Sequence, residues 1–331
     1  MVSKMRHVQL PIKLLSLIGV LLGMLLLGLT SGSVHIPAGD ILSSLWSPEY
    51  TVTKAILMDI RIPRLIIAAF VGANLAASGG LLQSVMRNPL ADPGITGVSA
   101  GASLCAITIM LLFPAYVHMV PLAAFMGGAL ACAFVYALAW KNGIQPLRIV
   151  LAGVALNAVL GGATGLLSIL NSDKIQGVLL WTNGSIARAS WQDVSVLVPY
   201  SLVGLVLALF LIRPANILLL GDDAAQNLGF NVNRTRIIIS AVAVLLAGAS
   251  VAAVGIIGFV GLVVPHICRL LFGSDYKKLL PTSMLLGAAT LVGADTLART
   301  IAAPVELPVG TMMAMLGGPF FLYLLRKGER M

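Results

Sequence analysis

The chain has 331 residues, of which 59% are hydrophobic and 10% are charged, a composition that excludes an ordinary soluble protein and favours a protein of the lipid bilayer. The net charge of +9 does not point to a nucleic-acid partner, because the basic residues are scattered singly or in short groups between long apolar runs. Charges placed in this way are typical of a multi-span membrane protein, in which they set the orientation of the spans.

Apolar runs of about 20 residues, long enough to span a bilayer, follow one another along the chain. The first is a Leu-rich run preceded by Lys4, Arg6 and Lys13, and no small-residue cleavage site follows it. We therefore interpret it as a transmembrane helix rather than a signal peptide. The runs that each predict one span are 14–30, 62–82, 95–113, 119–139, 149–170, 195–212, 283–301 and 309–325.

The apolar stretch 237–272 is too long for one span and short for two. If it forms two spans, broken near Gly255 and Gly258, the chain has ten spans and both termini lie on one side. Six of the 21 Lys and Arg residues then lie on the opposite side and the other fifteen on the side of the termini, whereas a single span would divide them almost evenly. Only the ten-span arrangement obeys the positive-inside rule, and it places both termini in the cytoplasm. The outer six are Lys54, Arg61, Arg64, Lys174, Arg188 and Arg299.

The sequence thus predicts an all-α integral membrane protein with about ten transmembrane helices. Small residues at four-residue intervals predict close helix packing. The segment GANLAASGG at 72–80, followed by Pro89, is similar to AGASVAAVG at 247–255, followed by Pro265, and this similarity indicates an inverted repeat of spans 2–5 and 7–10. The small residues at these intervals include Gly72, Ala76 and Gly80, and Gly153, Gly161 and Gly165.

Soluble catalytic motifs are absent from the sequence, which has no HExxH, no CxxC and no P-loop. The chain is therefore not expected to bind or hydrolyse ATP. Its three cysteines, Cys105, Cys132 and Cys268, all lie in apolar segments and are predicted to be small core residues rather than disulfides or metal ligands. The pattern GxSxG at 97–101 leaves an intramembrane serine protease, with Ser99 and His266 as its catalytic pair, as a less favoured alternative.

The segment RNPLADPGITG at 87–97 interrupts the apolar pattern at the cytoplasmic end of span 2. Pro89 and Pro93 remove backbone donors and disfavour helical geometry before them. Non-helical backbone near membrane depth is tolerated only where it is buried or lines a cavity. The segment is thus a candidate gate or pore wall, with an ordinary tight turn as the alternative.

The longest cytoplasmic connection, 213–236, is predicted to contain a short helix that Asp222 or Asp223 caps and that ends at Gly229. Ala225 and Leu228 would lie on one face of it. Such a small apolar face suits docking to a soluble partner, and a solvated loop is the alternative.

On the outer side, Arg61 and Arg64 open span 2, and Arg299 ends span 9 near Glu306. These arginines either anchor the helices at the interface or form an electropositive mouth for a partner that carries carboxylates. Asp295 is costly in lipid, so we expect it to face protein or water and to pair with Arg299.

Seven segments together resemble the FecCD permeases, which are the membrane subunits of type II ATP-binding-cassette (ABC) importers for iron-siderophores, haem and cobalamin. The resemblance runs over nearly the whole chain in the right order. The segments are RIPR at 61–64, ASGGLLQSVMRNPLADPGITGVSAGA at 77–102, LAGVALN from 151, WTNGSIARASW from 181, GFVGLVVPHICRLLFG from 258, GADTLART from 293 and ELPVGTMMAMLGGPFFLYLLRK from 306.

The resemblance implies a single permease domain, 1–331, with a coupling loop at 213–236, in the inner or plasma membrane of a bacterium. It implies a homo- or heterodimer of permeases on two ATPase subunits that bind the ATP, and a binding protein that delivers cargo from outside. The chain itself would bind no cofactor and no metal. Pro146 and Leu147 differ from the small hydroxyl residues of the cobalamin relative, which counts against cobalamin as cargo. A ferric siderophore is the favoured cargo, with cobalamin or haem as the alternative.

The resemblance also assigns roles to individual residues. Arg61, Arg64 and Arg299 would dock the binding protein. The residues assigned to ATPase coupling are Gly221, Asp222, Asp223, Ala225, Leu228 and Gly229, and those assigned to the translocation path and its gate are Gln83, Asn88, Pro89, Leu90, Pro146 and Leu147. The rival from another transporter class is an ion-coupled carrier that uses Asp295.

Overall fold

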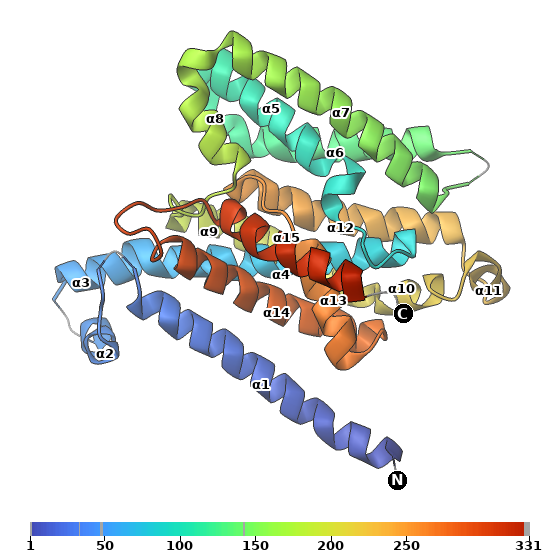
Figure 1. The fold of residues 1–331 in the computed structure, drawn as a ribbon, viewed down its shortest axis with the longest axis horizontal. Coiled ribbons are helices and arrows are strands. Elements are labelled where there is room, and N and C mark those ends of the chain that lie inside the picture. The colour runs from blue at the N-terminus through green and yellow to red at the C-terminus, as the bar shows by residue number, and fades with distance from the viewer. Residues whose placement is uncertain (1, 33, 47–48, 142, 328–331) are drawn as a thin grey trace.

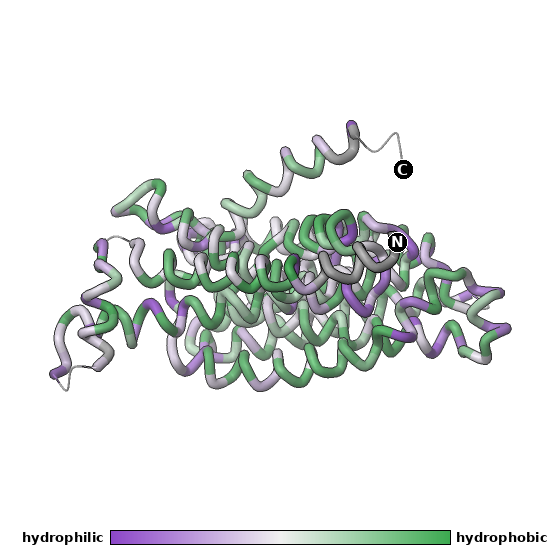
Figure 2. Tube along the Cα trace, turned by 90° about the horizontal axis from the view of Figure 1, so that it is seen from below, coloured by the Kyte–Doolittle hydropathy of each residue, from purple (hydrophilic) through white to green (hydrophobic). Residues whose placement is uncertain are grey.

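The computed structural model describes residues 2–32, 34–46, 49–141 and 143–327, and helices make up most of this part of the chain. Long helices run side by side along the longest axis of the molecule (Figure 1), and the C-terminal end of the last helix, α15, projects away from the others (Figure 2). The principal helices are α1 (Val2–Thr30), α4 (Ile62–Met86), α5 (Val98–Leu112), α6 (Val120–Ala139), α7 (Pro146–Leu170), α9 (Trp191–Phe210), α12 (Val232–Val254), α13 (Val260–Phe272), α14 (Tyr276–Ala298) and α15 (Val309–Lys327).

Seven helical segments in the described residues are long and apolar enough to cross a membrane, and α5, α13 and residues 309–323 of α15 are shorter apolar helices. Short elements connect them: α2 (Ala38–Trp46), α3 (Val52–Ala55), a π-helix (Ile56–Arg61), α8 (Ile175–Thr182), α10 (Ile212–Leu218), α11 (Asp222–Asn227) and 3₁₀ turns at Pro93–Thr96, Pro114–Met119 and Ser172–Lys174. The seven segments are Pro11–Thr30, Val52–Met86, Pro114–Ala139, Pro146–Leu170, Trp191–Phe210, Val232–Val254 and Tyr276–Ala298.

The ambiguous stretch 237–272 forms two helices, as predicted. Gly255 ends α12 with a φ of 76°, and the chain has no regular structure until α13 begins at Val260. A side chain at Gly255 would overlap the carbonyl oxygen of Trp181, so a close backbone approach as well as the positive φ requires glycine here.

Helix α4 lies at the centre of the bundle, in contact with α9, α12, α13 and α14. Almost all of its residues are buried. Two polar side chains tie it to its neighbours: the Asn74 amide donates to Ser201 Oγ at 2.7 Å, and the Ser78 hydroxyl donates to the Ala243 carbonyl at 2.7 Å. Hydrogen bonds of this kind join helices where lipid supplies no polar partner.

The prediction of close packing at small residues is confirmed at some positions and wrong at others. Gly72 lies against the backbone of Gly287, and Gly153 lies against the carbonyl of Ile95, so a side chain at either position would overlap main-chain atoms. A Cβ at Gly161 or at Gly165 would have no neighbour within 4 Å. The reason is that this part of α7 is largely exposed, so the spacing alone did not reveal which helix faces lie inside the chain.

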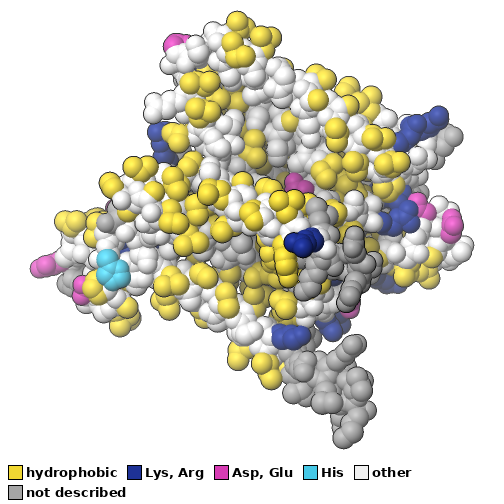
Figure 3. Space-filling view, viewed as in Figure 1, with side chains coloured by type: hydrophobic (Ala, Val, Ile, Leu, Met, Phe, Trp, Pro, Cys, Tyr) yellow, Lys and Arg dark blue, Asp and Glu magenta, His cyan; other side chains and the backbone are white. Residues whose placement is uncertain are grey.

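The two ends of the molecule differ in the elements that they contain and in the number of basic side chains visible on them. The start of α1 and the end of α15 lie at the same end as α10 and α11, whereas α2 and α3 lie at the opposite end (Figure 1). Most of the Lys and Arg side chains visible in Figure 3 lie toward the end with α10 and α11, and hydrophobic side chains cover the middle.

Candidate functional site

Arg61 and Arg64, which are close in sequence, meet the distant Arg299 at the end of the bundle near α3. Arg61 ends the π-helix, Arg64 lies in the first turn of α4, and Arg299 follows α14. Arg64 binds two carboxylates, with its Nε 2.9 Å from Asp295 Oδ2 and its Nη1 2.8 Å from Glu306 Oε2. Asp295 Oδ2 is also 3.9 Å from Arg299 Nε, which confirms the predicted pairing. Asp295 is fully buried and faces protein, as expected.

Two of these arginines also hold the end of α1. Arg61 donates hydrogen bonds to the carbonyls of Leu29 and Val34, and Arg299 donates to the carbonyl of Gly28. Each of the three arginines is at most 4% exposed. An open mouth lined by exposed arginines is therefore not formed in this conformation, because the guanidinium groups are used within the chain. Docking of a partner by these residues stays a prediction.

At the opposite end, the chain leaves α4 through the predicted break. Arg87 ends the helix in the left-handed region, at a φ of 48°. Asn88 Oδ1 then accepts a hydrogen bond from the N–H of Leu90 at 2.9 Å, and Asp92 caps the 3₁₀ turn that starts at Pro93. These local bonds give the segment a defined shape without a helix. We call residues 87–97 the first gate loop.

Gln83 joins the first gate loop to α13. It is 1% exposed, its Nε2 lies 3.5 Å from the carbonyl oxygen of Ala91 and 3.4 Å from that of Gly261, and its Oε1 accepts from Arg269 at 3.0 Å. Gln83 therefore holds the loop in place and lines no open path in this structure. Of the other predicted gate residues, Pro146 is half-buried and the exposed ones are Asn88, Pro89, Leu90 and Leu147.

The first gate loop also packs on α7. Asn157 donates to the carbonyl of Gly94 at 2.9 Å, and the absence of a side chain at Gly153 lets the carbonyl of Ile95 approach the helix. One face of α7 thus supports the loop while most of that helix is exposed.

The second gate loop, which we define as residues 143–147, precedes and begins α7. Ile144 forms an isolated bridge with Trp140. Its N–H donates to Asn233 Oδ1 at 2.9 Å and its carbonyl accepts from Arg236 Nη1 at 2.7 Å. The second gate loop is therefore fixed to the start of α12.

The short helix predicted within 213–236 exists as α11, and Gly229 follows it with a positive φ of 81°. The prediction that Asp222 or Asp223 caps it is wrong, because Gly221 is the N-cap residue and no side chain makes the cap hydrogen bond. The carboxylate of Asp222 instead accepts two hydrogen bonds from Arg236, with Oδ1 2.9 Å from Nη2 and Oδ2 3.2 Å from Nη1.

The predicted apolar face of α11 is also wrong. Ala225 is fully buried against the rest of the chain, whereas Leu228 is 59% exposed. The two side chains diverge because α11 ends at Asn227, which leaves Leu228 beyond the last helical turn. On this loop, Leu220 (61% exposed) and Leu228 are the apolar side chains that face outward most fully.

The other short helix of the loop, α10, is anchored to the start of α14. Asn216 donates from its amide to Asp275 Oδ1 at 2.7 Å and accepts from the N–H of Tyr276 at 2.9 Å. The pKa of Asp275 is lowered, mainly by the hydrogen bond from the N–H of Lys277 and also by that of Asn216. This clamp was not predicted, because a polar pair 59 positions apart leaves no pattern in the sequence.

Asp222 makes one further ion pair that the sequence did not reveal. Its Oδ1 lies 3.5 Å from Nη2 of Arg87, the residue that opens the first gate loop. Asp222 therefore contacts Arg87 on one side and Arg236 on the other.

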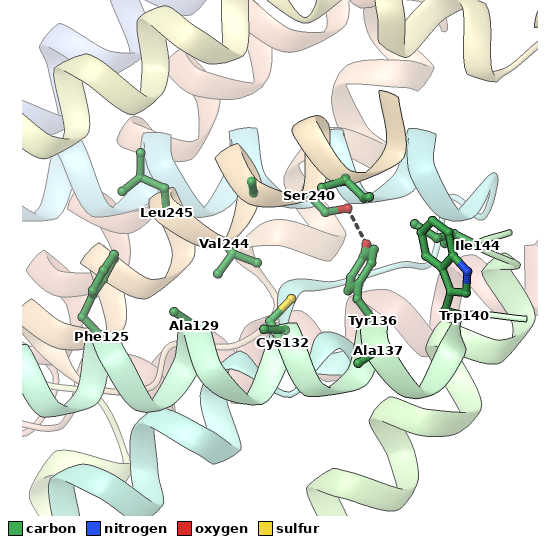
Figure 4. Close-up of a pocket in the computed structure, with 13 residues that line it drawn as sticks. Phe125, Ala129, Cys132, Tyr136, Ala137, Trp140, Ile144, Ser240, Val244 and Leu245 are labelled. Atoms are coloured by element: carbon green, nitrogen blue, oxygen red, sulfur yellow. Dashed lines mark hydrogen bonds between the residues drawn. The ribbon is translucent and has the colours of Figure 1, made fainter. Parts of the chain in front are cut away.

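An apolar hollow of about 780 Å³ lies between α6 and α12 (Figure 4). Phe125, Cys132, Val244 and Leu245 line it, and a hydrogen bond between the hydroxyls of Tyr136 and Ser240 crosses it. None of the predicted gate, docking or coupling residues lines this hollow.

A sequence model of the FecCD transport family matches residues 20–327. The chain belongs to the FecCD transport family. It is 44% identical to the Fe(3+)-citrate import system permease protein YfmD of Bacillus subtilis over 92% of this chain and 91% of that protein. It is 42% identical to the hemin transport system permease protein HmuU of Yersinia pestis, over 83% of this chain and 84% of that protein.

Solved structures agree with this assignment. A chain assigned to the metal-chelate type ABC transporters, in an inward-facing conformation, superposes with a TM-score of 0.85 at 28% identity, over 96% of this chain and 99% of that one. PsaBC from Streptococcus pneumoniae shares the fold, with a TM-score of 0.59 at 17% identity over 86% of this chain and 94% of that chain.

This FecCD protein is thus a multi-span membrane permease component of an ATP-driven ABC importer, with no catalytic activity of its own. The protease alternative gains no support from the structure, since no hydrogen bond joins Ser99 to His266 in the described residues and both imidazole nitrogens lack a partner. No cluster of His, Cys, Asp or Glu in those residues could hold a metal, and the three cysteines are free. Cys132 and Cys268 are buried as predicted, while Cys105 is half-buried.

Proposed function

We propose that this permease carries a ferric siderophore or a similar iron chelate across the plasma membrane of a bacterium. The observation that carries the proposal is 44% identity, over nearly the full length of both chains, to a permease for Fe(3+)-citrate. A second Fe(3+)-citrate permease of Bacillus subtilis is 39% identical over 98% of this chain. Haem and cobalamin stay the alternative cargoes, since permeases named for each are 42% and 44% identical over 83% of this chain.

In the proposed membrane topology, ten helices span the bilayer, and both termini and the coupling loop 213–236 lie in the cytoplasm. Seven long and three shorter apolar helices in the described residues support this count. The common location of α10, α11, the start of α1 and the end of α15 supports the shared side of the termini (Figure 1). The whole chain then acts as one permease domain.

The inverted repeat of spans 2–5 and 7–10 is supported by the way the helices pair. Helix α5 packs on α6 as α13 packs on α14, and α6 contacts α7 as α14 contacts α15. The first helix of each set packs on the third helix of the other, α4 on α14 and α12 on α6. These matched pairs are expected if two similar units face each other in opposite orientation.

A second permease subunit would cover α7, the last helix of the first repeat. Its outward positions are large and apolar, and Leu147, Leu151, Val154 and Leu166 are each more than half exposed. A cargo path between two such subunits, with ATP bound by two separate ATPase subunits and cargo delivered by an external binding protein, completes the proposed importer.

The function is tested by reconstituting the permease with its ATPase and binding protein in lipid vesicles. Radiolabelled ferric citrate, a ferric hydroxamate, haemin and cobalamin are supplied separately. We expect ATP-dependent accumulation of an iron chelate that is lost with a hydrolysis-deficient ATPase. Accumulation of cobalamin or haemin alone would overturn the cargo. Uptake that survives loss of the ATPase and collapses with a protonophore would identify an ion-coupled carrier.

The binding-protein contact is best tested at Arg61. Its charge has no carboxylate partner within the described part of the chain, whereas Arg64 and Arg299 share Asp295. Replacing Arg64 or Arg299 would disturb that buried ion pair, so a loss of docking could not be separated from a loss of structure. Glutamine at position 61 removes the charge and keeps a donor for the neighbouring carbonyls.

We expect Arg61→Gln to weaken association with the binding protein by roughly 2–5 kcal/mol, as for loss of one member of a buried charge pair. The measurement is equilibrium binding of the purified binding protein to the transporter in nanodiscs. Arg188→Gln, which removes an exposed cation predicted for the same side, is the control and should bind as the wild type does. Equal affinities of Arg61→Gln and wild type would exclude Arg61 from docking.

A further inference from the structure

We propose that Asp222 is a positioning residue that joins the coupling helix α11 to both gate loops, so that its carboxylate delivers the movement of α11 to the gate. This inference rests on the proposed function, in which an ATPase moves the coupling loop. It adds a specific route within the permease, from α11 through two ion pairs to residues 87–97 and 143–147.

The first arm of the route runs to the first gate loop. Arg87 Nη2 lies 3.5 Å from Asp222 Oδ1, and its Nη1 lies 3.6 Å from the position that a Cβ on Gly221 would occupy. Arg87 is both the last point of α4 and the first residue of the loop, and its left-handed φ of 48° is unusual for a residue other than glycine. A displacement of Arg87 would therefore redirect the chain at the residues immediately before Leu90.

The second arm runs to the second gate loop. Asp222 binds Arg236 with both carboxylate oxygens, at 2.9 and 3.2 Å. Arg236 connects Asp222 to the second gate loop, because its Nη1 also donates to the carbonyl of Ile144 at 2.7 Å. The carboxylate of Asp222 thus contacts the first gate loop directly through Arg87, and it reaches the second gate loop through Arg236.

The ion pair of Asp222 with Arg236 is stronger than its ion pair with Arg87, and the two pairs therefore have different roles. The side chain of Arg236 is 2% exposed and makes paired, short hydrogen bonds, so this arm holds α11 to α12. The side chain of Arg87 is 40% exposed, that of Asp222 is 37% exposed, and their separation is longer. Exposed ion pairs of this kind are weak. The Arg87 arm is therefore the one that opens and closes while the Arg236 arm stays formed.

Space for such a movement exists beside Asp222. A polar hollow of about 370 Å³ lies between α11, the second gate loop and the start of α12, and Asp222, Gln145, Gln226 and Asn233 line it. The carboxylate can turn toward this hollow and leave Arg87 without displacing apolar core residues.

The test follows the first gate loop directly in the assembled transporter. Leu90, 37% exposed, is replaced by cysteine in nanodisc-embedded permease with its ATPase subunits, and its rate of modification by a water-soluble maleimide is measured with and without a non-hydrolysable ATP analogue. Permease without this cysteine gives the background from the three native cysteines. We expect ATP-analogue binding to change the rate in the otherwise unaltered protein.

The decisive variant is Arg87→Gln, which removes only the exposed arm. We expect it to keep its ATPase subunits and to lose the nucleotide-dependent change at position 90, and Arg87→Lys to restore part of that change. Asp222→Asn, which weakens both arms, should lose it as well, with Asp222→Glu as the conservative rescue. Arg234→Gln is the matched control, since Arg234 is an exposed cation two residues before Arg236 with no ion pair in the described residues, and it should keep the full response.

Two outcomes overturn different statements. If Arg87→Gln assembles and responds as fully as Arg234→Gln, the proposed role of Asp222 is wrong and the proposed transporter stands. If the otherwise unaltered permease binds no ATPase subunit and shows no nucleotide response, the proposed function itself is wrong. If Asp222→Asn fails to assemble with the ATPase subunits, Arg87→Gln alone tests the proposed role of Asp222. The partly exposed side chain of Arg87 is not needed to fill the core, so this variant should still fold.

Discussion

An Asp295→Ala variant is expected to lose about 3–5 kcal/mol of folding stability, the usual cost of leaving a buried charge without its partner. Asp295 is fully buried and accepts hydrogen bonds from both Nε and Nη2 of Arg64 at 2.9 Å. Its removal would also leave Arg299 without the carboxylate that lies 3.9 Å away. The measurement is thermal unfolding of the detergent-purified permease, together with its yield from membranes.

Glu306→Gln is the matched control for this variant. Glu306 binds the same guanidinium, at 2.8 Å, but its side chain is 37% exposed. Loss of a solvent-exposed ion pair costs about 0–1 kcal/mol. Equal destabilisation by the two substitutions would show that burial of Asp295 is not the source of its effect.

The same position separates the importer from an ion-coupled carrier. If Asp295 took up and released an ion during transport, Asp295→Asn would fold normally and lose only the dependence of uptake on an ion gradient. Asp295 instead lies between two buried arginines, and loss of its charge would remove the carboxylate 3.9 Å from Arg299 and leave Arg64 paired with Glu306 alone. Asp295→Asn should therefore lower the unfolding temperature of the permease, and it should not act only on the dependence of uptake on an ion gradient.

The sequence was sufficient for those parts of the fold that the bilayer dictates. Each helix that crosses lipid needs about 20 apolar residues, and this requirement leaves a strong signal in residue order. The break between α12 and α13 was predictable for a related reason, since Gly255 lies inside an apolar stretch too long for one span. The breaks at prolines, such as the one after α4, follow from backbone geometry that any protein must obey.

Helix ends and connecting helices were less accessible to sequence analysis. Span 9 was expected to start at residue 283, and α14 starts at Tyr276. The polar residues Lys277 and Lys278 hide this start from a hydropathy pattern. Asp275 caps the helix there, and the buried hydroxyl of Tyr276 donates to the carbonyl of Gly80 at 2.6 Å. These contacts depend on the fold as a whole, so residue order alone could not reveal them.

The candidate sites show the same division. The sequence placed the three arginines at helix ends, a break at residues 87–97 and a short helix within 213–236, because prolines, glycines and isolated charges mark these elements. It did not show that Arg61 is buried against the end of α1 or that Asp222 lies between two arginines. Both facts depend on pairs of residues that are distant along the chain, and single charges carry no information about their partners.

A Gly79→Val variant is expected to prevent stable packing of α4 on α13. Any Cβ at Gly79 would overlap the carbonyl of Gly261, and this backbone carbonyl cannot move aside as a flexible side chain could. Overpacking of a filled core costs roughly 1–3 kcal/mol and sometimes more, and this position lies at the high end of that range because main chain meets main chain. The crossing also positions Gln83, whose amide nitrogen lies 3.4 Å from the same carbonyl, so the first gate loop should lose its support on α13.

The adjacent residue gives the matched control for this prediction. A Cβ at Gly80 would lie 3.7 Å from Leu280 Cδ1 and 3.9 Å from Pro265, which is ordinary van der Waals contact. Gly80→Ala should therefore leave the unfolding temperature and yield of the permease close to those of wild type, whereas Gly79→Ala should lower both and Gly79→Val should lower them further. If the substitutions at positions 79 and 80 had equal effects, loss of glycine from α4 would be the cause, and the close approach of α4 to α13 would not be what requires glycine at position 79.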